Sequence, residues 1–322
     1  MQYLNDIFEL VDDKKAILLD NYGTLVGGHG FYPGVLDIMR ALVHAGKKVV
    51  IFTNDSRTAA DVKTKIDGKG AEQDTHYHEI ISSGQVLWEM ANSENNWFAK
   101  LGCKKPCKYW TLGQPYHAAL PSDKFKPVDD LGSADLVYLG YPGFSAAEIK
   151  NLPPGSDQYL CEFYDWHNVY VEFTKFYLDQ ISNYLDFIQK KNIPVVSPNP
   201  DISAEISSDN QRRFIVEQGT VVKYLHLRLG HSPLEIGKPY AAMYDHAKKT
   251  LFQKYGIMAD EIIAIGDSID TDIKGAENAG LDSALVTENG LAREQEGDFW
   301  NTLLARQGIF GCHLLRGIRS RH

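Results

Sequence analysis

The stretch AILLDNYGT, residues 16–24, decides the fold. Its first four residues are apolar, and an unbroken apolar run of this length is typical of a strand buried on both faces of a parallel sheet. The run ends on Asp20, and Gly23 then allows a sharp turn. Open α/β sheets bind their ligands at the carboxyl ends of their strands, so Asp20 lies where a ligand would bind. On this stretch alone, a strand followed by an ordinary polar turn explains the pattern equally well.

The same pattern occurs at two other places in the chain. The predicted strand 48–52, apolar from Val49 onward, is followed by Thr53 and Asn54, and the predicted strand 261–266, apolar from Ile262 onward, is followed by Asp267. Because parallel strands place their carboxyl ends at the same edge of a sheet, we expect these polar side chains to lie near Asp20.

Helix signals separate these strands. Apolar residues at helical spacing follow Pro33 and stop before Gly46, so residues 16–52 predict a strand–helix–strand unit with a right-handed crossover. We expect Ser56 to cap the next helix, Pro239 to open a helix that runs to about residue 255, and another helix at about 269–279. Further strands are predicted at 78–82 and at 283–287, and the last of these is expected to complete the sheet.

Four segments together carry a family resemblance. The segments 16–24, 48–56, 236–239 and 261–273, in this order, resemble the four motifs of the haloacid dehalogenase (HAD) superfamily of phosphotransferases. Each motif alone is weak, but four in order at suitable spacing form a specific signal. The wording GKP at 237–239 and GDSIDTDI at 266–273 is most similar to subfamily IIA, the NagD-like and p-nitrophenylphosphatase-like branch. The resemblance spans about residues 14–290.

The resemblance implies an α/β fold, with a doubly wound (Rossmann-like) parallel-sheet core and an inserted α/β cap domain. We therefore divide the chain into a first part of the core at 1–83, the cap at 84–231 and a second part of the core at 232–322. Within the cap, the loop SPNPD at 197–201 resembles a Thr-Asn-Pro-Asp segment of subfamily IIA. The other elements expected in the cap are strands at 108–112, 135–141 and 193–197 and a helix at about 173–190.

The resemblance also implies the chemistry: a Mg²⁺-dependent phosphatase that forms an aspartyl-phosphate. A carboxylate suits the nucleophile because it is ionised at neutral pH, and Mg²⁺ prefers oxygen ligands. The alternatives without chemistry are that Asp267 and Asp272 are loop or helix-capping acids, that Thr53 is an N-cap or turn residue, and that Lys238 is a solvated surface lysine. The resemblance implies that Asp20 is the nucleophile, and that Asp20, Asp267 and the main-chain carbonyl of Tyr22 are the metal ligands. It implies that the phosphate is bound by Thr53, Asn54 and Lys238. Asp272 is then expected to orient the metal waters or Lys238 from behind.

Tyr22 departs from the family pattern, which usually has a second Asp at this position. That Asp acts as general acid and base, a role worth ~10²–10⁴ in rate, and a phenol with a reference pKa near ~10 is a poor substitute. We count Tyr22 with Asp20 as the candidate catalytic residues and keep three outcomes open. In the first outcome, the protein prefers aryl phosphates, including phosphotyrosine in peptides or proteins. In the second, another group, such as one from the cap, replaces the acid in a small-metabolite phosphatase. In the third, catalysis is lost, which leaves a phosphate-binding or scaffold protein.

Composition bounds the partners. The chain has 322 residues and a net charge of −9, which argues against nucleic-acid binding, because that normally uses a basic face. The predicted partner is a phosphorylated substrate. The basic end, with Arg316, Arg319, Arg321 and His322, is expected to be a solvated terminus, with membrane-surface or partner binding as the alternative.

Four cysteines are too few for a disulfide scaffold. We expect Cys103 and Cys107 to be free thiols, with a zinc site as the alternative. The N-terminal sequence has no secretory pattern, and no apolar run approaches the ~18 residues of a membrane span. A cytoplasmic location is therefore expected.

Overall fold

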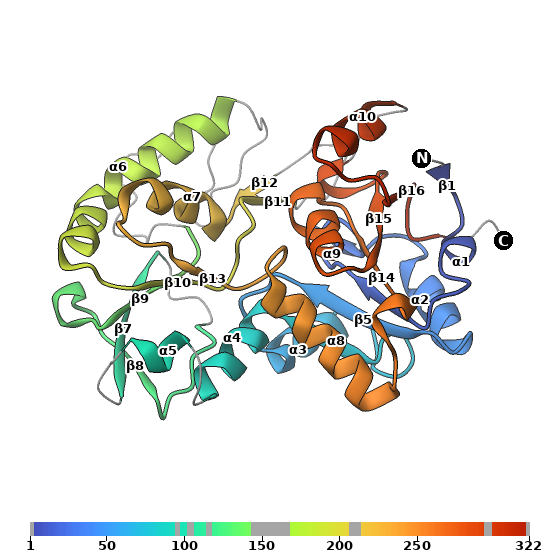
Figure 1. Ribbon diagram of the computed structural model, residues 1–322, viewed down its shortest axis with the longest axis horizontal. Coiled ribbons are helices and arrows are strands. Elements are labelled where there is room, and N and C mark those ends of the chain that lie inside the picture. The colour runs from blue at the N-terminus through green and yellow to red at the C-terminus, as the bar shows by residue number, and fades with distance from the viewer. Residues whose placement is uncertain are drawn as a thin grey trace.

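Two parallel sheets lie side by side in the computed structural model, which describes residues 3–93, 97–101, 106–113, 118–142, 168–205, 214–292 and 298–319 (Figure 1). The larger sheet takes its strands from both ends of the chain, and the smaller sheet takes its strands from the middle. This arrangement confirms the predicted α/β class with a parallel core sheet.

The larger sheet has seven strands, and every pair in it is parallel. The prediction that a strand at 283–287 completes it was wrong, because two further strands extend this edge. Strands of two or three residues are too short to give a periodic signal in the sequence. The strand order is β1 (Tyr3–Leu4), β16 (His313–Leu315), β15 (Asp282–Val286), β14 (Ile262–Gly266), β2 (Ala16–Leu19), β5 (Lys48–Thr53) and β6 (Glu79–Ser82).

Helices cover both faces of this sheet, as the apolar run of β2 predicts. Ile17 and Leu19 pack in one cluster with residues of α1 (Ile7–Leu10), α2 (Val35–His44) and α3 (Ala59–Asp67). Ala16 and Leu18 pack on the opposite face with residues of α4 (Ser83–Asn92) and α8 (Ala241–Tyr255). Since alternate residues of a strand point to opposite faces, only an all-apolar strand can serve both clusters. The helices α9 (Lys274–Asn278) and α10 (Asp298–Arg306) lie near β15 and β16.

The smaller sheet has the order β13 (Leu234–Glu235), β10 (Val195–Ser197), β9 (Leu136–Leu139), β7 (Cys107–Leu112) and β8 (Phe125–Pro127), again all parallel. One face packs against α6 (Asn168–Lys191) and α7 (Gln218–Arg228). Residues of the other face, such as Tyr138 and Val196, belong to the same buried cluster as Leu18 of the larger sheet. The two sheets therefore share one continuous apolar core, while the cap boundaries at residues 84 and 231 stay a prediction.

The remaining elements are short. They are the hairpin β3 (Val26–Gly27) and β4 (Gly30–Phe31), the pair β11 (Ser203–Glu205) and β12 (Phe214–Val216), and the helix α5 (Trp97–Lys100), together with single helical turns at Leu131–Ser133, Ala259–Glu261, Ile269–Ile273 and Gly290–Ala292.

Three local predictions differ from the structure. The cap of α3 is Thr58, not Ser56, and its side chain accepts a hydrogen bond from the Asp61 N–H at 3.3 Å. Helix α8 begins at Ala241, so Pro239 lies ahead of it. The helix expected at about 269–279 is present, but its first turn, Ile269–Ile273, is a π-helix capped by Ser268, and α9 continues it to Asn278.

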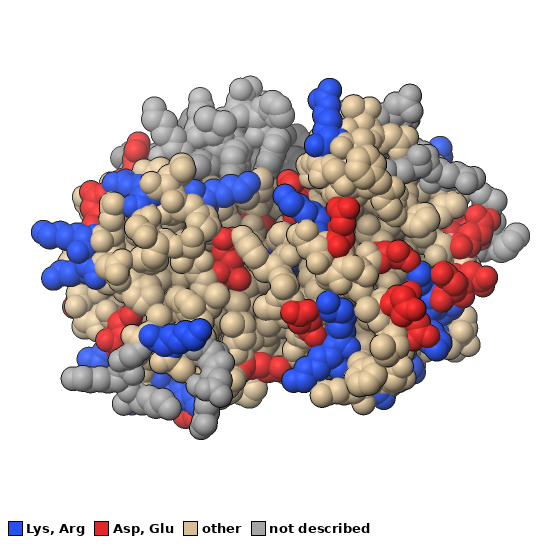
Figure 2. Space-filling model, viewed as in Figure 1, with Lys and Arg blue, Asp and Glu red and all other residues tan. Residues whose placement is uncertain are grey.

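Acidic and basic side chains are interspersed on the face of the molecule shown in Figure 2. Within the described part of the chain, the helices are too short or too polar to cross a membrane. Arg319 forms an ion pair with Glu288, whereas Arg321 and His322 lie outside the described residues. Cys107 is buried and is not part of a disulfide, and Cys103 lies outside the described residues.

Candidate active site

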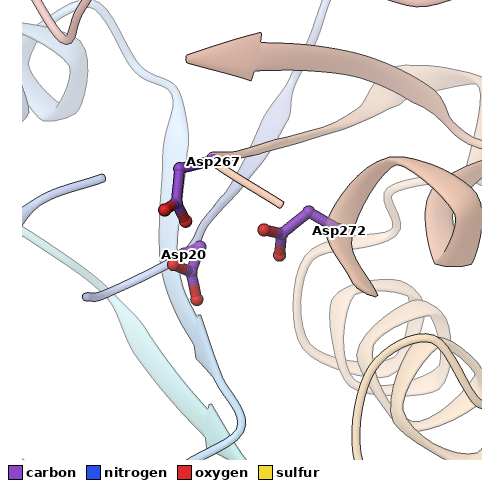
Figure 3. A group of neighbouring side chains, drawn as sticks. All are labelled: Asp20, Asp267 and Asp272. Carbon is purple, nitrogen blue, oxygen red and sulfur yellow. The ribbon is translucent and has the colours of Figure 1, made fainter. Parts of the chain in front are cut away.

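Two acids from distant parts of the chain meet at the carboxyl edge of the larger sheet. Asp20 follows β2 and Asp267 follows β14, and these strands pair directly, with Leu19 opposite Ile265. The prediction that Asp267 lies near Asp20 is therefore confirmed. Asp272 joins them from the turn after β14, and one carboxylate oxygen of each acid lies within 4.8 Å of the others (Figure 3). All three side chains are buried.

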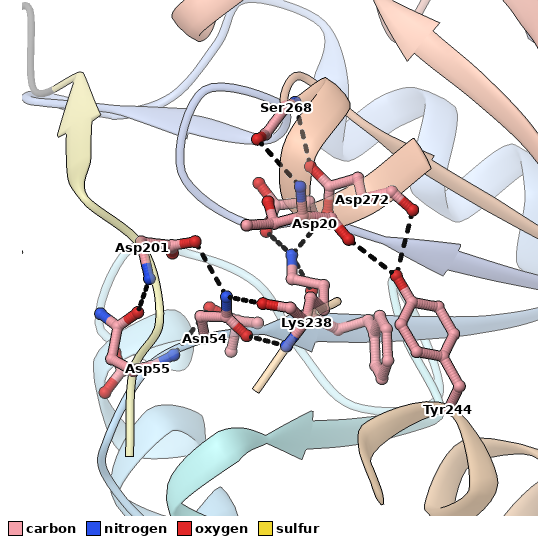
Figure 4. Close-up of polar contacts among 12 residues, drawn as sticks. Asp20, Asn54, Asp55, Asp201, Lys238, Tyr244, Ser268 and Asp272 are labelled. Atoms are coloured by element: carbon pink, nitrogen blue, oxygen red, sulfur yellow. Dashed lines mark hydrogen bonds and ion pairs between the residues drawn. The ribbon is translucent and has the colours of Figure 1, made fainter. Parts of the chain in front are cut away.

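Lys238 places one positive charge against this cluster. Its Nζ atom forms ion pairs with Asp20 and with Asp272, the latter at 2.7 Å from Oδ1, and donates to the Phe52 carbonyl at 3.1 Å (Figure 4). The side chain is 2% exposed, which excludes the surface lysine considered from the sequence. Burial alone would lower the pKa of Lys238, but Asp20 and Asp272 reverse this and hold it well above its usual value. Lys238 is therefore a fixed cation.

The cluster would carry more negative than positive charge with all three acids ionised. Burial raises the pKa of Asp20 to about 7, although Lys238 opposes the shift. Burial and the charge of Asp20 raise the pKa of Asp267 well above its usual value. Three carboxylates around one ammonium group leave a local excess of negative charge, and a divalent cation compensates such an excess. Carboxylate oxygens are also the ligands that Mg²⁺ prefers, so the donor set fits this ion.

Two glycines close tightly around Asp267. Gly23 and Gly290 have φ of +84° and +66°, and a Cβ atom on either would lie 2.2 Å or 2.0 Å from Asp267 Oδ2. Beside Gly290, the Leu291 N–H donates to the same oxygen at 2.6 Å. The loops after β2 and β15 therefore fix the orientation of this carboxylate.

Thr53 and Asn54 follow β5 at the same edge. The Thr53 hydroxyl oxygen accepts a hydrogen bond from the Asp55 N–H at 3.3 Å. The Asn54 amide joins two segments: Oδ1 accepts from the Lys238 N–H at 2.6 Å, and Nδ2 donates to the Lys238 carbonyl at 3.0 Å and to Asp201 Oδ1 at 2.9 Å. Asn54 thus connects the lysine loop of the core to the loop after β10.

Tyr22 is directed toward α3. The Nζ atoms of Lys65 and Lys69 lie 4.8 Å and 5.2 Å from the centre of its ring, a geometry that favours cation–π attraction. Its hydroxyl forms no hydrogen bond within the described residues. The side chain thus has its contacts beside α3 rather than with Lys238.

Sequence reasoning gave no role to three residues that complete the surroundings. Tyr244 donates to the Asp272 carbonyl at 3.0 Å, and Asp201 contacts Asn54 as described above. Glu217, next to the start of α7, accepts from Asn199 Nδ2 at 3.0 Å. The NPD segment at 199–201 was a usable signal for this region, whereas a tyrosine inside a helix or an acid at its start carries none.

Comparison with known families agrees with this geometry. A family model described as haloacid dehalogenase-like hydrolase matches residues 17–114, and a second one, described as HAD-hydrolase-like, matches residues 235–306. These ranges contain β2, β5 and β14 with Asp20, Lys238 and Asp267. The chain belongs to the haloacid dehalogenase superfamily.

The similarity to individual known proteins extends over almost the whole of this chain. The chain is 23% identical over 292 residues to a 4-nitrophenylphosphatase of Schizosaccharomyces pombe, covering 89% of this chain and 88% of that protein. Among solved structures, a possible sugar phosphatase from Cytophaga hutchinsonii has a TM-score of 0.70 at 23% identity, with 99% and 98% of the two chains covered. A glycerol phosphate phosphatase from Mycobacterium tuberculosis in complex with magnesium has a TM-score of 0.60 at 18% identity, with 99% and 79% covered. The prediction of subfamily IIA is confirmed by its 4-nitrophenylphosphatase-like and NagD-like relatives and neighbours.

Proposed function

We propose that this protein is a Mg²⁺-dependent phosphatase that hydrolyses small phosphomonoesters through a phosphorylated Asp20. One observation carries the proposal: Asp20 shares a buried cluster with Asp267 and Asp272, and the cluster is in direct contact with the Lys238 ammonium group. A site for phosphoryl transfer needs a nucleophile and positive charge for the phosphate oxygens, and this cluster offers both.

The chain's own residues divide the work as follows. The Asp20 carboxylate attacks phosphorus, and Lys238 offsets charge on the equatorial oxygens. The Thr53 hydroxyl donates to a phosphate oxygen. Asn54 holds the Lys238 backbone in place through its two hydrogen bonds, and Asp272 fixes the Lys238 ammonium group.

Asp20, Asp267 and the main-chain carbonyl of Tyr22 would hold the ion. Bound Mg²⁺ would reduce the repulsion between the Asp20 carboxylate and the phosphate dianion. The excess negative charge of the cluster and the magnesium in the similar solved structure support this assignment.

A small substrate is supported by the contact between the loop after β10 and Asn54, because this loop lies beside the phosphate-binding residues. The substrates named for the relatives, which are 4-nitrophenyl, sugar and glycerol phosphates, are also small. We therefore do not extend the proposal to phosphotyrosine proteins. The preference for aryl over alkyl esters, predicted from Tyr22, stays a prediction that depends on what protonates the leaving group.

The test is phosphate release from 4-nitrophenyl phosphate by the purified full chain. We expect turnover with Mg²⁺, its loss in EDTA, and a fall of at least ~10³ in Asp20→Asn. Asp270→Asn, which removes an exposed acid three residues after Asp267, is the matched control and is expected to keep the activity. If 4-nitrophenyl phosphate and glycerol phosphate are both left intact with Mg²⁺, the proposal is wrong.

A further inference from the structure

The proposed reaction needs a proton donor on the side of the leaving group, and Tyr22 is poorly placed for it. Its ring lies beside Lys65 and Lys69, and its hydroxyl has no partner among the described residues. Lys238 is committed to Asp20, Asp272 and the Phe52 carbonyl. We propose that Asp201, on the loop after β10, protonates the leaving oxygen and later activates the attacking water. This inference rests on the proposed phosphatase function.

The position of Asp201 suits this role. Its carboxylate extends from the loop after β10 toward Lys238 and Asp20 (Figure 4), and its Oδ1 accepts from Asn54 Nδ2 at 2.9 Å. The residue is partly exposed, and its second carboxylate oxygen, Oδ2, forms no hydrogen bond within the described part of the chain. One oxygen is therefore fixed beside the phosphate-binding residues, and the other is free to reach a substrate.

The loop that carries Asp201 is held firmly. The Asp201 N–H donates to Asn199 Oδ1 at 2.8 Å, and the Asp201 carbonyl accepts from the Gly219 N–H at 2.9 Å. The preceding Pro200 packs so closely that a Cβ atom on Gly219 would lie 2.0 Å from its carbonyl oxygen, and one on Gly237 would lie 2.4 Å from its Cδ. Gly237 directly precedes Lys238, so the loop is packed against the lysine segment itself.

Other nearby acids are committed elsewhere. Glu217 accepts from Asn199 at 3.0 Å and from the Tyr141 hydroxyl at 3.4 Å, with one oxygen used for each. Asp55 is paired with Arg57. Burial raises the pKa of Asp201 to about 6, although Lys238 and Asn54 oppose the shift. A carboxyl with this pKa is protonated in about a tenth of molecules at pH 7, which is enough for a general acid.

The proton balance of the two steps is complete. In the first step, the Asp20 oxygen forms a bond to phosphorus and the ester P–O bond breaks, while protonated Asp201 gives its proton to the departing oxygen and an alcohol leaves. In the second step, water forms a bond to phosphorus and the P–O bond to Asp20 breaks, while the Asp201 carboxylate takes a proton from that water. Inorganic phosphate leaves, and both acids return to their starting states.

The experiment compares two leaving groups in four proteins: the wild type, Asp201→Asn, Tyr22→Asp and the double variant. The 4-nitrophenolate anion is stabilised by its nitro group and leaves without protonation, whereas the alkoxide of glycerol phosphate requires it. We expect Asp201→Asn to lose ~10²–10⁴ in kcat/KM on glycerol phosphate and little on 4-nitrophenyl phosphate. Tyr22→Asp in the Asp201→Asn background is expected to restore most of the loss. Turnover of 4-nitrophenyl phosphate also shows that each variant is folded.

Glu217→Gln is the matched control, since it replaces a buried acid that contacts the same loop but not Asn54. We expect it to leave the ratio of the two activities unchanged. Equal losses on both substrates in Asp201→Asn would mean that Asp201 only positions Asn54, and no loss would mean that it has no role; either result overturns the proposal. A wild type that hydrolyses only 4-nitrophenyl phosphate would also overturn it, yet would leave the proposed phosphatase function intact. Absence of all turnover would refute both.

Discussion

Replacing Asp267 by Asn should stabilise the metal-free protein, and Mg²⁺ should cancel or reverse this gain relative to the wild type. The experiment requires a pH above the raised pKa values of Asp20 and Asp267, so that both acids are ionised. Two unit charges 4.8 Å apart, the upper limit for the oxygens of these two acids, then repel by at least ~3.5 kcal/mol at an effective dielectric constant of about 20. The attraction of Lys238 offsets part of this repulsion, so we expect a net gain of ~1–3 kcal/mol in the metal-free variant. Asparagine keeps an oxygen that accepts from the Leu291 N–H, so this contact need not be lost.

The assay is thermal unfolding of the full chain in EDTA and in Mg²⁺. A gain of 1 kcal/mol corresponds to about 2–4 °C in Tm for a domain of this size, so Asp267→Asn should melt several degrees above the wild type in EDTA. At 100 times its Kd, Mg²⁺ should stabilise the wild type by ~2.7 kcal/mol and the variant much less. Asp270→Asn should follow the wild type in both buffers. If Asp267→Asn melts below the wild type in EDTA, or gains as much from Mg²⁺, the electrostatic argument fails.

Three further predictions follow from the same site. In EDTA, the folded-state pKa of Asp20 of about 7 lies above its unfolded value of ~3.9, so the folded protein binds the proton more tightly and this group's contribution to stability declines from about pH 4 to about pH 7. As the pH rises through this range, the Tm should fall more steeply in the wild type than in Asp20→Asn. Parallel curves of Tm against pH would contradict this. Lys238→Met leaves Asp20 and Asp272 buried without their cation, so it should lower the free energy of unfolding by ~3–5 kcal/mol, measured with urea in EDTA. It should also lower kcat by at least ~10². An unchanged midpoint of urea unfolding would refute the first expectation. Gly290→Ala places a Cβ atom 2.0 Å from Asp267 Oδ2 and should raise the Mg²⁺ concentration needed for activity. Gly308→Ala, also at positive φ but with open space around it, should leave this concentration unchanged. Equal effects of the two substitutions would show that backbone strain alone matters.

Several features of the site could be predicted from sequence because they depend on strand ends. The apolar runs before Asp20 and Asp267 marked two buried strands, and the parallel pairing of β2 with β14 brings the two acids together. Lys238 was found only through its motif, since no periodicity indicates that a lysine before a helix is buried.

The features that sequence did not reveal depend on tertiary packing. Strand β16 and the edge strand β1 are too short to give a signal, and Thr58 takes the capping position because its hydroxyl reaches the Asp61 N–H. The contact between Asn54 and Asp201 joins residues 147 positions apart. Such a contact follows from how the loop after β10 packs on Gly237, and local propensity cannot predict it.

The most direct measurement is acid-quenched peptide mapping of the full chain mixed with 4-nitrophenyl phosphate and Mg²⁺. A phosphoryl group should appear on Asp20 within the peptide that contains residues 16–24, and it should be absent in EDTA and in Asp20→Asn. Turnover with the phosphoryl group on another residue, or undiminished turnover by Asp20→Asn, would contradict the account.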